Sequence, residues 1–167
     1  LVLVDPAFLT TLPDRKMRAG WAEIIKYAMI ERTAAPPGED EPTLLETLMR
    51  ADLARDYSDP ALVTDIIGRS VRLKAAVVQA DERESGLRRL LNYGHTLGHA
   101  MEAAGYRYLH GEAVALGMRA AARIAERLSI CSPSLVTLQD QLLDDLDLPR
   151  EFVGSRQLVM DRLTHDK

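Results

Sequence analysis

Two neighbouring stretches hold the most informative residues of this chain: residues 90–102, LLNYGHTLGHAME, and residues 109–114, LHGEAV. The chain has four histidines, and three of them, His95, His99 and His110, fall within these stretches. A single histidine on an amphipathic helix is usually an ordinary core or surface residue. Three imidazoles gathered so closely in a chain with so few of them indicate a site.

The spacing of the polar residues places them on one side of a predicted helix over residues 87–105. On such a helix Arg88, Asn92, His95 and His99 lie at positions i, i+4, i+7 and i+11, which form one stripe. In an apolar core, a stripe of a cation, an amide and two imidazoles would leave buried donors and acceptors without partners. The pattern therefore favours convergence on a ligand or a metal ion.

Composition limits the fold and the partners of the chain. Its 167 residues suffice for one well-packed domain. The formal net charge of -4 and the absence of any dense run of Lys and Arg argue against a nucleic-acid partner. The single cysteine, Cys131, cannot form an internal disulfide, which fits a reducing cytoplasm, and no apolar run is long enough to span a membrane.

The first five residues, LVLVD, predict one short β-strand ahead of a helical chain. Their apolar run is typical of an interior strand, so we expect it to be the remnant of an upstream α/β domain that is missing here. We therefore divide the chain into residues 1–13, the end of that domain with a linker, and residues 14–167, a helical domain. The predicted fold class is all-α with this one N-terminal strand.

Helical periodicity and capping signals predict six or seven helices in the rest of the chain. Asp14 is expected to cap the first, and Asp59 followed by Pro60 is a strong start for another that runs to about Val78. Charged residues and a glycine at 81–86 interrupt the pattern before the histidine-bearing helix. The remaining predicted helices cover residues 44–49, 112–128, 135–146 and 157–163.

Two imidazoles and one carboxylate form a common catalytic zinc site, because three protein ligands hold the ion and leave a fourth position open. We assign the imidazoles to His95 and His110. For the carboxylate we choose Glu23, which lies beside a lysine on an otherwise apolar-faced helix. The spacing alone leaves Glu102 and Glu112 open as alternatives.

An alternative pair of metal ligands is His95 with His99. They lie at i and i+4, as in the helical motif of zinc proteases. That motif places a glutamate directly after its first histidine, and this chain has Thr96 there. The general base of the protease reaction is therefore absent, which weakens this alternative.

Three cations stand out in an otherwise acidic chain: Lys26, Lys74 and Arg88. Lys26 lies three residues after Glu23, a spacing that also fits an ordinary ion pair on a helix surface. If the three cations converge, the natural ligand is an anion such as a carboxylate or a phosphate. Arg88 suits bidentate contact with either group.

Five segments of the chain, in order, resemble the C-terminal domain of the 3-dehydroquinate synthase family, within the sugar phosphate cyclases. The resemblance covers nearly the whole chain, and its histidine signature is highly specific. The segments are residues 5–13 (DPAFLTTLP), 20–26 (GWAEIIK), Lys74 with 81–88 (DERESGLR), 91–99 (LNYGHTLGH) and 110–118 (HGEAVALGM).

The resemblance implies an NAD- and zinc-dependent lyase with two domains, in which the N-terminal α/β domain binds NAD and the helical domain carries zinc, or cobalt, and most substrate groups. It also implies a full-length homodimer. The implied zinc ligands are Glu23, His95 and His110. The implied substrate and proton-transfer residues are Lys26, Lys74, Arg88, Asn92 and His99. The implied NAD-facing residues are Phe8, Leu9, Thr10 and Thr11, and the chain ends at Lys167 in what resembles the start of a further lysine motif.

The reaction implied by the resemblance belongs to the shikimate pathway of aromatic amino acid and chorismate biosynthesis. It converts 3-deoxy-D-arabino-heptulosonate 7-phosphate to 3-dehydroquinate and phosphate through transient oxidation by NAD, phosphate elimination and aldol closure. No glycine-rich dinucleotide fingerprint occurs in this chain, so we expect little turnover from it alone. The alternatives are a cyclase that makes 2-epi-5-epi-valiolone, 2-deoxy-scyllo-inosose or aminodehydroquinate, a metal-dependent polyol dehydrogenase, and a non-catalytic metal-binding module.

Overall fold

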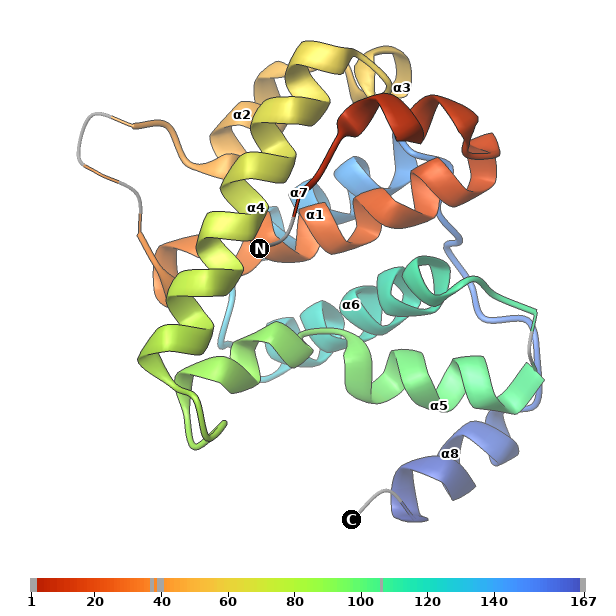
Figure 1. Ribbon diagram of the computed structural model, residues 1–167. Helices are drawn as coiled ribbons and strands as arrows, with labels where there is room; N and C mark the ends of the chain where they lie inside the picture. Colours follow the sequence, from red (N-terminus) through yellow and green to blue (C-terminus); the bar gives the residue numbers. More distant parts are fainter. Residues whose placement is uncertain (1–2, 37, 39–40, 106, 166–167) are drawn as a thin grey trace.

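The computed structural model describes residues 3–36, 38, 41–105 and 107–165, and within these residues all regular structure is helical (Figure 1). The all-α prediction is confirmed. The elements in chain order, with η marking a 3₁₀ helix, are η1 (Pro6–Thr11), α1 (Asp14–Ala34), α2 (Leu44–Arg50), α3 (Leu53–Asp56), α4 (Pro60–Ala80), η2 (Leu87–Asn92), α5 (His95–Gly105), α6 (His110–Arg127), α7 (Pro133–Asp144) and α8 (Arg156–His165).

The predicted N-terminal strand is not found in the described residues. Leu3, Val4 and Asp5 form no strand, and Leu3 is 86% exposed, while Leu1 and Val2 lie outside the described residues. A strand needs a hydrogen-bonded neighbour, and no segment of the described chain provides one. The side chain of Asp5 instead accepts a hydrogen bond from the Ala7 N–H and caps η1.

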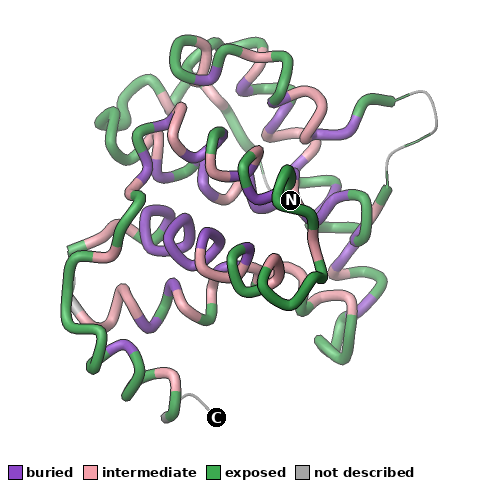
Figure 2. The backbone as a smooth tube through the Cα atoms, turned by 180° about the vertical axis from the view of Figure 1, so that it is seen from behind, coloured by how far each residue is buried: buried purple, intermediate pink, exposed green. Residues whose placement is uncertain are grey.

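Helices α1 and α6 pack against each other through the middle of the molecule (Figure 1). Helix α1 also contacts α2 and α4, α6 also contacts α5, and α7 packs against both α1 and α6. The N-terminal half of α6 is buried almost without interruption (Figure 2), and α1 buries Trp21, Ala22 and Ile25. The two central helices thus contribute much of the apolar core.

Several helix starts follow the predicted capping signals. Asp59 accepts a hydrogen bond from the Leu62 N–H at 2.8 Å and is followed by Pro60 at the first position of α4, as predicted. The prediction for Asp14 is wrong, because Pro13 occupies the N-cap position and Asp14 is the first residue of α1. In that first turn, the negative charge of its carboxylate still interacts favourably with the positive end of the helix dipole.

The predicted single helix over residues 87–105 is also wrong, because the chain turns at Tyr93 and Gly94 between η2 and α5. Gly94 has a φ of 80°, a left-handed conformation that glycine adopts without strain. A Cβ atom at this position would lie 2.8 Å from the carbonyl oxygen of Val114 on α6. The break therefore has a tertiary cause, the close approach of the start of α5 to α6.

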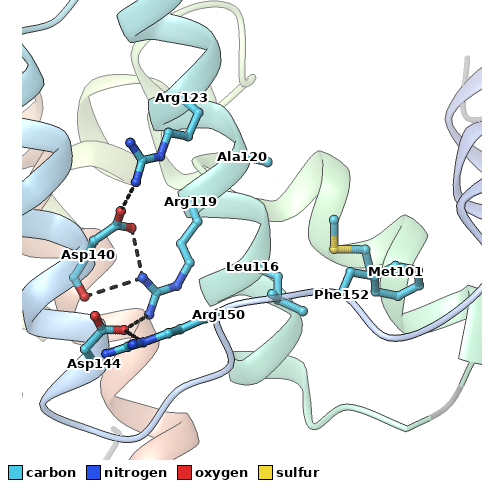
Figure 3. A pocket seen from close by; sticks show the side chains of 9 residues that line it. All are labelled: Met101, Leu116, Arg119, Ala120, Arg123, Asp140, Asp144, Arg150 and Phe152. Atoms are coloured by element: carbon cyan, nitrogen blue, oxygen red, sulfur yellow. Dashed lines mark hydrogen bonds and ion pairs between the residues drawn. The ribbon is translucent and has the colours of Figure 1, made fainter.

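Helix α6 is tied to α7 by a network of ion pairs centred on the buried Arg119 (Figure 3). Arg119 binds Asp140 at 2.9 Å and Asp144 at 2.7 Å, and Arg123 and Arg150 each pair with one of the same carboxylates. These five residues line part of a pocket of about 500 Å³. Because these charged groups bind one another, their ion pairs link the two helices.

Among the described residues, none of the helices combines the length and the apolar character that crossing a bilayer requires.

Candidate metal centre

Three helices bring a carboxylate and two imidazoles together. Glu23 lies on α1, His95 is the first residue of α5 and His110 is the first residue of α6. The Oε1 atom of Glu23 lies 3.4 Å from Nε2 of His95 and 3.8 Å from Nε2 of His110. Residues distant in the sequence thus meet at one point, as the zinc prediction requires.

The free oxygen of Glu23 fits a metal ion at this point. Its Oε1 atom is buried and has no hydrogen-bond partner among the described residues, which is costly for a carboxylate oxygen unless a cation satisfies it. Zinc bonds of about 2.0–2.1 Å in a tetrahedral site place neighbouring ligand atoms about 3.4 Å apart. The 3.4 Å distance from Oε1 to His95 matches that spacing, and the 3.8 Å distance to His110 is 0.4 Å longer.

The third imidazole of the cluster lies within the same space. The rings of His95 and His99 have centroids 5.3 Å apart, and those of His99 and His110 are 5.7 Å apart. One ring nitrogen from each of the three histidines lies within 4.8 Å of the other two. A metal ion in this cluster could therefore be reached by His99 as well, and Glu23 would supply a negative charge to it.

The position of His95 is fixed by the turn that precedes it. Its Nδ1 atom lies 3.2 Å from the carbonyl oxygen of Tyr93, and the Tyr93 hydroxyl donates a 2.7 Å hydrogen bond to the side chain of Gln139 on α7. Burial lowers the pKa of His95, and the charge of nearby Lys26 acts in the same direction. Both effects favour the neutral imidazole, which is the form that binds metals.

Two residues that support this turn, Tyr93 within it and Gln139 on α7, were missed from the sequence. Burial raises the pKa of Tyr93 to about 12, so its phenol stays a hydrogen-bond donor to Gln139. Gln139 is completely buried. A lone amide within the apolar positions of a predicted helix was the signal that could have identified Gln139, because such a group needs a specific partner.

The two alternative carboxylates have other partners. The Glu112 side chain binds Arg15 at 2.6 Å and accepts a hydrogen bond from the Leu109 N–H, which caps α6. The Glu102 carboxylate lies 3.2 Å from His110, on the Nδ1 atom of the ring and not on the Nε2 atom that faces Glu23. Of the three glutamates left open by the sequence, Glu23 alone has an oxygen between the two imidazoles.

Lys26 lies inside the site. Its side chain is 4% exposed, its Nζ atom lies 2.6 Å from Oε2 of Glu23, and it rests 4.9 Å from the centre of the Tyr27 ring. A surface ion pair, the ordinary alternative for these two residues, is therefore excluded. Glu23 binds the ammonium with one oxygen and presents the other to the histidines.

Arg88 and Asn92 lie on η2 and not on the histidine-bearing helix. The guanidinium of Arg88 donates to the carbonyl oxygen of Glu82 at 3.0 Å, and the amide of Asn92 donates to Glu84 at 2.8 Å. Both side chains are thus held by the loop that precedes η2. The predicted stripe of four polar residues on one helix is wrong, because the turn at Gly94 divides it into two pairs.

The loop before η2 is organised by one carboxylate. Asp81 accepts hydrogen bonds from the backbone N–H groups of Ser85, Gly86 and Arg88, at 2.8–3.0 Å. The Arg88 N–H and the other two backbone donors hold the pKa of Asp81 well below its usual range. Lys74, the remaining predicted substrate residue, is exposed on α4, with no hydrogen bond or ion pair to any part of the chain that the structure describes.

The predicted NAD-facing residues form part of η1. Phe8 is 73% exposed, while the hydroxyls of Thr10 and Thr11 donate to the carbonyl oxygens of Ala7 and Phe8. Leu9 and Thr10 also line a pocket of about 600 Å³ between η1 and the start of α4. The structure brings none of these residues into contact with the histidines in the described chain, and Lys167 lies outside the described residues.

Comparison with protein families identifies the family of this chain. The profile of the family described as "3-dehydroquinate synthase C-terminal" matches residues 20–167. The chain belongs to this family. The resemblance inferred from the histidine signature is therefore confirmed.

Relatives within the 3-dehydroquinate synthase family are similar to this chain over the part of their sequence that aligns with it. A 3-dehydroquinate synthase of Synechocystis sp. is 44% identical over 171 residues, covering 100% of this chain and 45% of that protein. One of Nitrosomonas europaea is 50% identical over 151 residues, covering 89% of this chain and 38% of that protein. The chain thus spans less than half the length of the curated relatives that it matches.

Solved structures of related cyclases share the fold of this 3-dehydroquinate synthase domain. A 2-deoxy-scyllo-inosose synthase complexed with carbaglucose-6-phosphate, NAD+ and Co2+ aligns with a TM-score of 0.78 at 25% identity, covering 98% of this chain and 43% of that one. A 2-epi-5-epi-valiolone synthase from Streptomyces hygroscopicus subsp. jinggangensis, with NAD+ and Zn2+ bound, aligns with a TM-score of 0.78 at 27% identity, covering 98% of this chain and 44% of that one. Both neighbours are enzymes solved with a dinucleotide and a divalent metal ion.

Proposed function

We propose that this chain is the metal- and substrate-binding part of a 3-dehydroquinate synthase. The observation that carries the proposal is the unpartnered Oε1 atom of Glu23, which lies between the Nε2 atoms of His95 and His110. The family match supports the choice of reaction. Under this proposal the chain contributes to the conversion of 3-deoxy-D-arabino-heptulosonate 7-phosphate to 3-dehydroquinate and phosphate.

Glu23, His95 and His110 are the proposed ligands of a Zn²⁺ or Co²⁺ ion. When bound, the ion supplies Lewis-acid stabilisation of negative charge on substrate oxygens. Three protein ligands leave room for those oxygens in the coordination shell. Lys26 holds the carboxylate of Glu23 from its other side and adds a positive charge next to the substrate position.

The other predicted residues are proposed to bind the substrate and move its protons. His99 contacts the ring of His95 and is exposed, so one of its ring nitrogens can take a proton from the substrate and return it. Arg88 and Lys74 are proposed to hold the carboxylate and phosphate groups, and Asn92 to orient a hydroxyl. The present partners of Arg88 and Asn92 in the loop 81–86 would then be exchanged in part for the substrate.

NAD would supply reversible hydride transfer, so the conversion would have no net redox change. Phe8, Leu9, Thr10 and Thr11 are the residues of this chain proposed to approach the dinucleotide. The full-length enzyme is proposed to be a homodimer of the cytoplasm, where the single thiol of Cys131 remains reduced.

A second candidate is another sugar phosphate cyclase, which the structural likeness to synthases of 2-deoxy-scyllo-inosose and 2-epi-5-epi-valiolone favours. The substrates of the candidates differ in a carboxylate that the heptulosonate carries. The spare hydrogen-bonding capacity of Arg88, which makes a single contact to Glu82 through its side chain, suits that carboxylate.

The test joins this chain to the N-terminal part of the Synechocystis sp. relative and measures phosphate release. With 3-deoxy-D-arabino-heptulosonate 7-phosphate we expect phosphate without net formation of NADH, and the variant His95→Ala should abolish it. Release from a hexose or heptose phosphate that lacks the carboxylate would indicate the second candidate. Net NADH formation with a polyol, or zinc binding without any turnover, would overturn both.

A further inference from the structure

The two proposed metal-binding imidazoles are each held at the ring nitrogen that faces away from Glu23. The Nδ1 atom of His95 lies 3.2 Å from the carbonyl oxygen of Tyr93, and the Nδ1 atom of His110 lies 3.2 Å from Oε2 of Glu102. A hydrogen on Nδ1 satisfies both contacts and leaves the lone pair of each ring on Nε2. Both Nε2 atoms are the ones nearest to Oε1 of Glu23.

The two rings differ in how firmly the rest of the fold holds them. The side chain of His95 is 14% exposed and is oriented by a backbone carbonyl within the turn that the tightly packed Gly94 fixes. The side chain of His110 is 47% exposed, and among the described residues its only hydrogen-bonding or ion-pair contacts are with Glu23 and Glu102. The orientation of the His110 ring therefore depends on Glu102.

We propose that Glu102 is a positioning residue that orients His110 toward the metal ion, an inference that rests on the proposed function. A carboxylate on the far nitrogen of a metal-binding imidazole fixes the tautomer and the rotation of the ring and makes the ring a stronger ligand. Glu102 lies on α5, eight residues before His110 and across the α5–α6 packing, so it also couples the ligand on α6 to the helix that carries His95.

A direct role of Glu102 as a metal ligand gives a different expectation. Its Oε2 atom is on the Nδ1 side of the His110 ring, whereas the ion proposed here lies on the Nε2 side with Glu23. A positioning carboxylate can be replaced by an amide, because the amide oxygen still accepts the hydrogen on Nδ1. A metal-binding carboxylate cannot be replaced in this way without a large loss of affinity.

The experiment measures the affinity of the chain for Zn²⁺ by competition with a chromophoric chelator, and the visible absorption of the Co²⁺-loaded chain, at one fixed pH. The variants are Glu102→Ala, Glu102→Gln and Glu23→Gln. Glu151→Ala is the matched control, since Glu151 is exposed and its side chain makes no hydrogen bond or ion pair within the described chain. Circular dichroism confirms that each variant is folded.

We expect Glu102→Ala to weaken Zn²⁺ binding about 10–100-fold and to change the Co²⁺ spectrum. Glu102→Gln should stay within a few-fold of the wild type, Glu151→Ala should equal it, and Glu23→Gln should lose more than either Glu102 variant. Unchanged affinity of Glu102→Ala would overturn the inference. So would a loss in Glu102→Gln as large as that in Glu23→Gln, which would make Glu102 a ligand.

The two proposals can fail separately. A wild-type chain that binds no Zn²⁺ overturns the metal centre and the role of Glu102 together. If Zn²⁺ binding depends on Glu102 as expected but the joined protein releases no phosphate from any sugar phosphate, the proposed function fails while the positioning role stands.

Discussion

Burial of a charged lysine next to an incompletely satisfied glutamate is the residue-scale feature that sets this site apart. Burying an ammonium group is costly unless an opposite charge lies beside it, and Lys26 has the Oε2 atom of Glu23 at 2.6 Å. The same carboxylate keeps its buried Oε1 atom without a hydrogen-bond partner in the described chain. One ammonium and one divalent cation on the two oxygens of Glu23 would satisfy both atoms.

At the same scale, Asp81 should make the free energy of unfolding depend on pH in the acidic range. Backbone N–H groups of Arg88, Ser85 and Gly86 lower its pKa in the folded state. Its contribution is therefore present above the unfolded pKa of about 3.9 and is lost as the pH falls toward the folded value. We expect Asp81→Asn to show a shallower loss of unfolding free energy below about pH 4, measured by urea unfolding at a series of pH values.

The control for this prediction is Glu82→Gln, in the same loop, whose carboxylate has no partner among the residues that the structure describes. It should keep the wild-type slope. An unchanged slope in Asp81→Asn would show that the loop does not depend on this carboxylate.

At the scale of elements, the sequence predicted what local chemistry determines. The α4 start at Asp59 and Pro60 follows from capping, and the apolar spacing of α1 follows from its burial in the core. The break at Gly94 was not predicted, because it results from the close approach of α6, which lies later in the chain. For the same reason spacing could not select Glu23 over Glu102, since the choice depends on which helices pack together.

The contact between α5 and α6 should be sensitive to a single methyl group. A Cβ atom at Gly117 on α6 would overlap the carbonyl oxygen of Gly94, and backbone atoms cannot move aside as a flexible side chain can. We expect Gly117→Ala to destabilise the protein by about 1–3 kcal/mol or more and to weaken Zn²⁺ binding, because it separates His95 from His110. Chemical unfolding and the chelator competition assay measure the two effects.

Gly20 provides the matched control within α1. A Cβ atom there would meet nothing within 4 Å, so Gly20→Ala should raise stability by up to about 1 kcal/mol through helix propensity alone. If Gly117→Ala is as harmless as Gly20→Ala, close helix packing is not what holds the two histidines together.

At the scale of the whole molecule, the proposed metal site is a product of the tertiary fold. Its proposed ligands come from α1, α5 and α6, and they meet because α6 packs against both of the other helices. An unfolded chain would not hold these groups together, so metal binding is coupled to folding. The dinucleotide is different, because the sequence contains no glycine-rich strand-turn-helix fingerprint that would bind its phosphates.

These two observations predict different responses of the chain to Zn²⁺ and to NAD. A ligand that binds only the folded state stabilises it by about 2.7 kcal/mol at one hundred times its dissociation constant. We therefore expect Zn²⁺ to raise the thermal unfolding midpoint of this chain, and NAD to leave the midpoint unchanged, with or without Zn²⁺. A shift with NAD would place a nucleotide site within these residues and contradict the expectation that turnover needs an additional domain, whereas the absence of a shift with Zn²⁺ would contradict the metal centre itself.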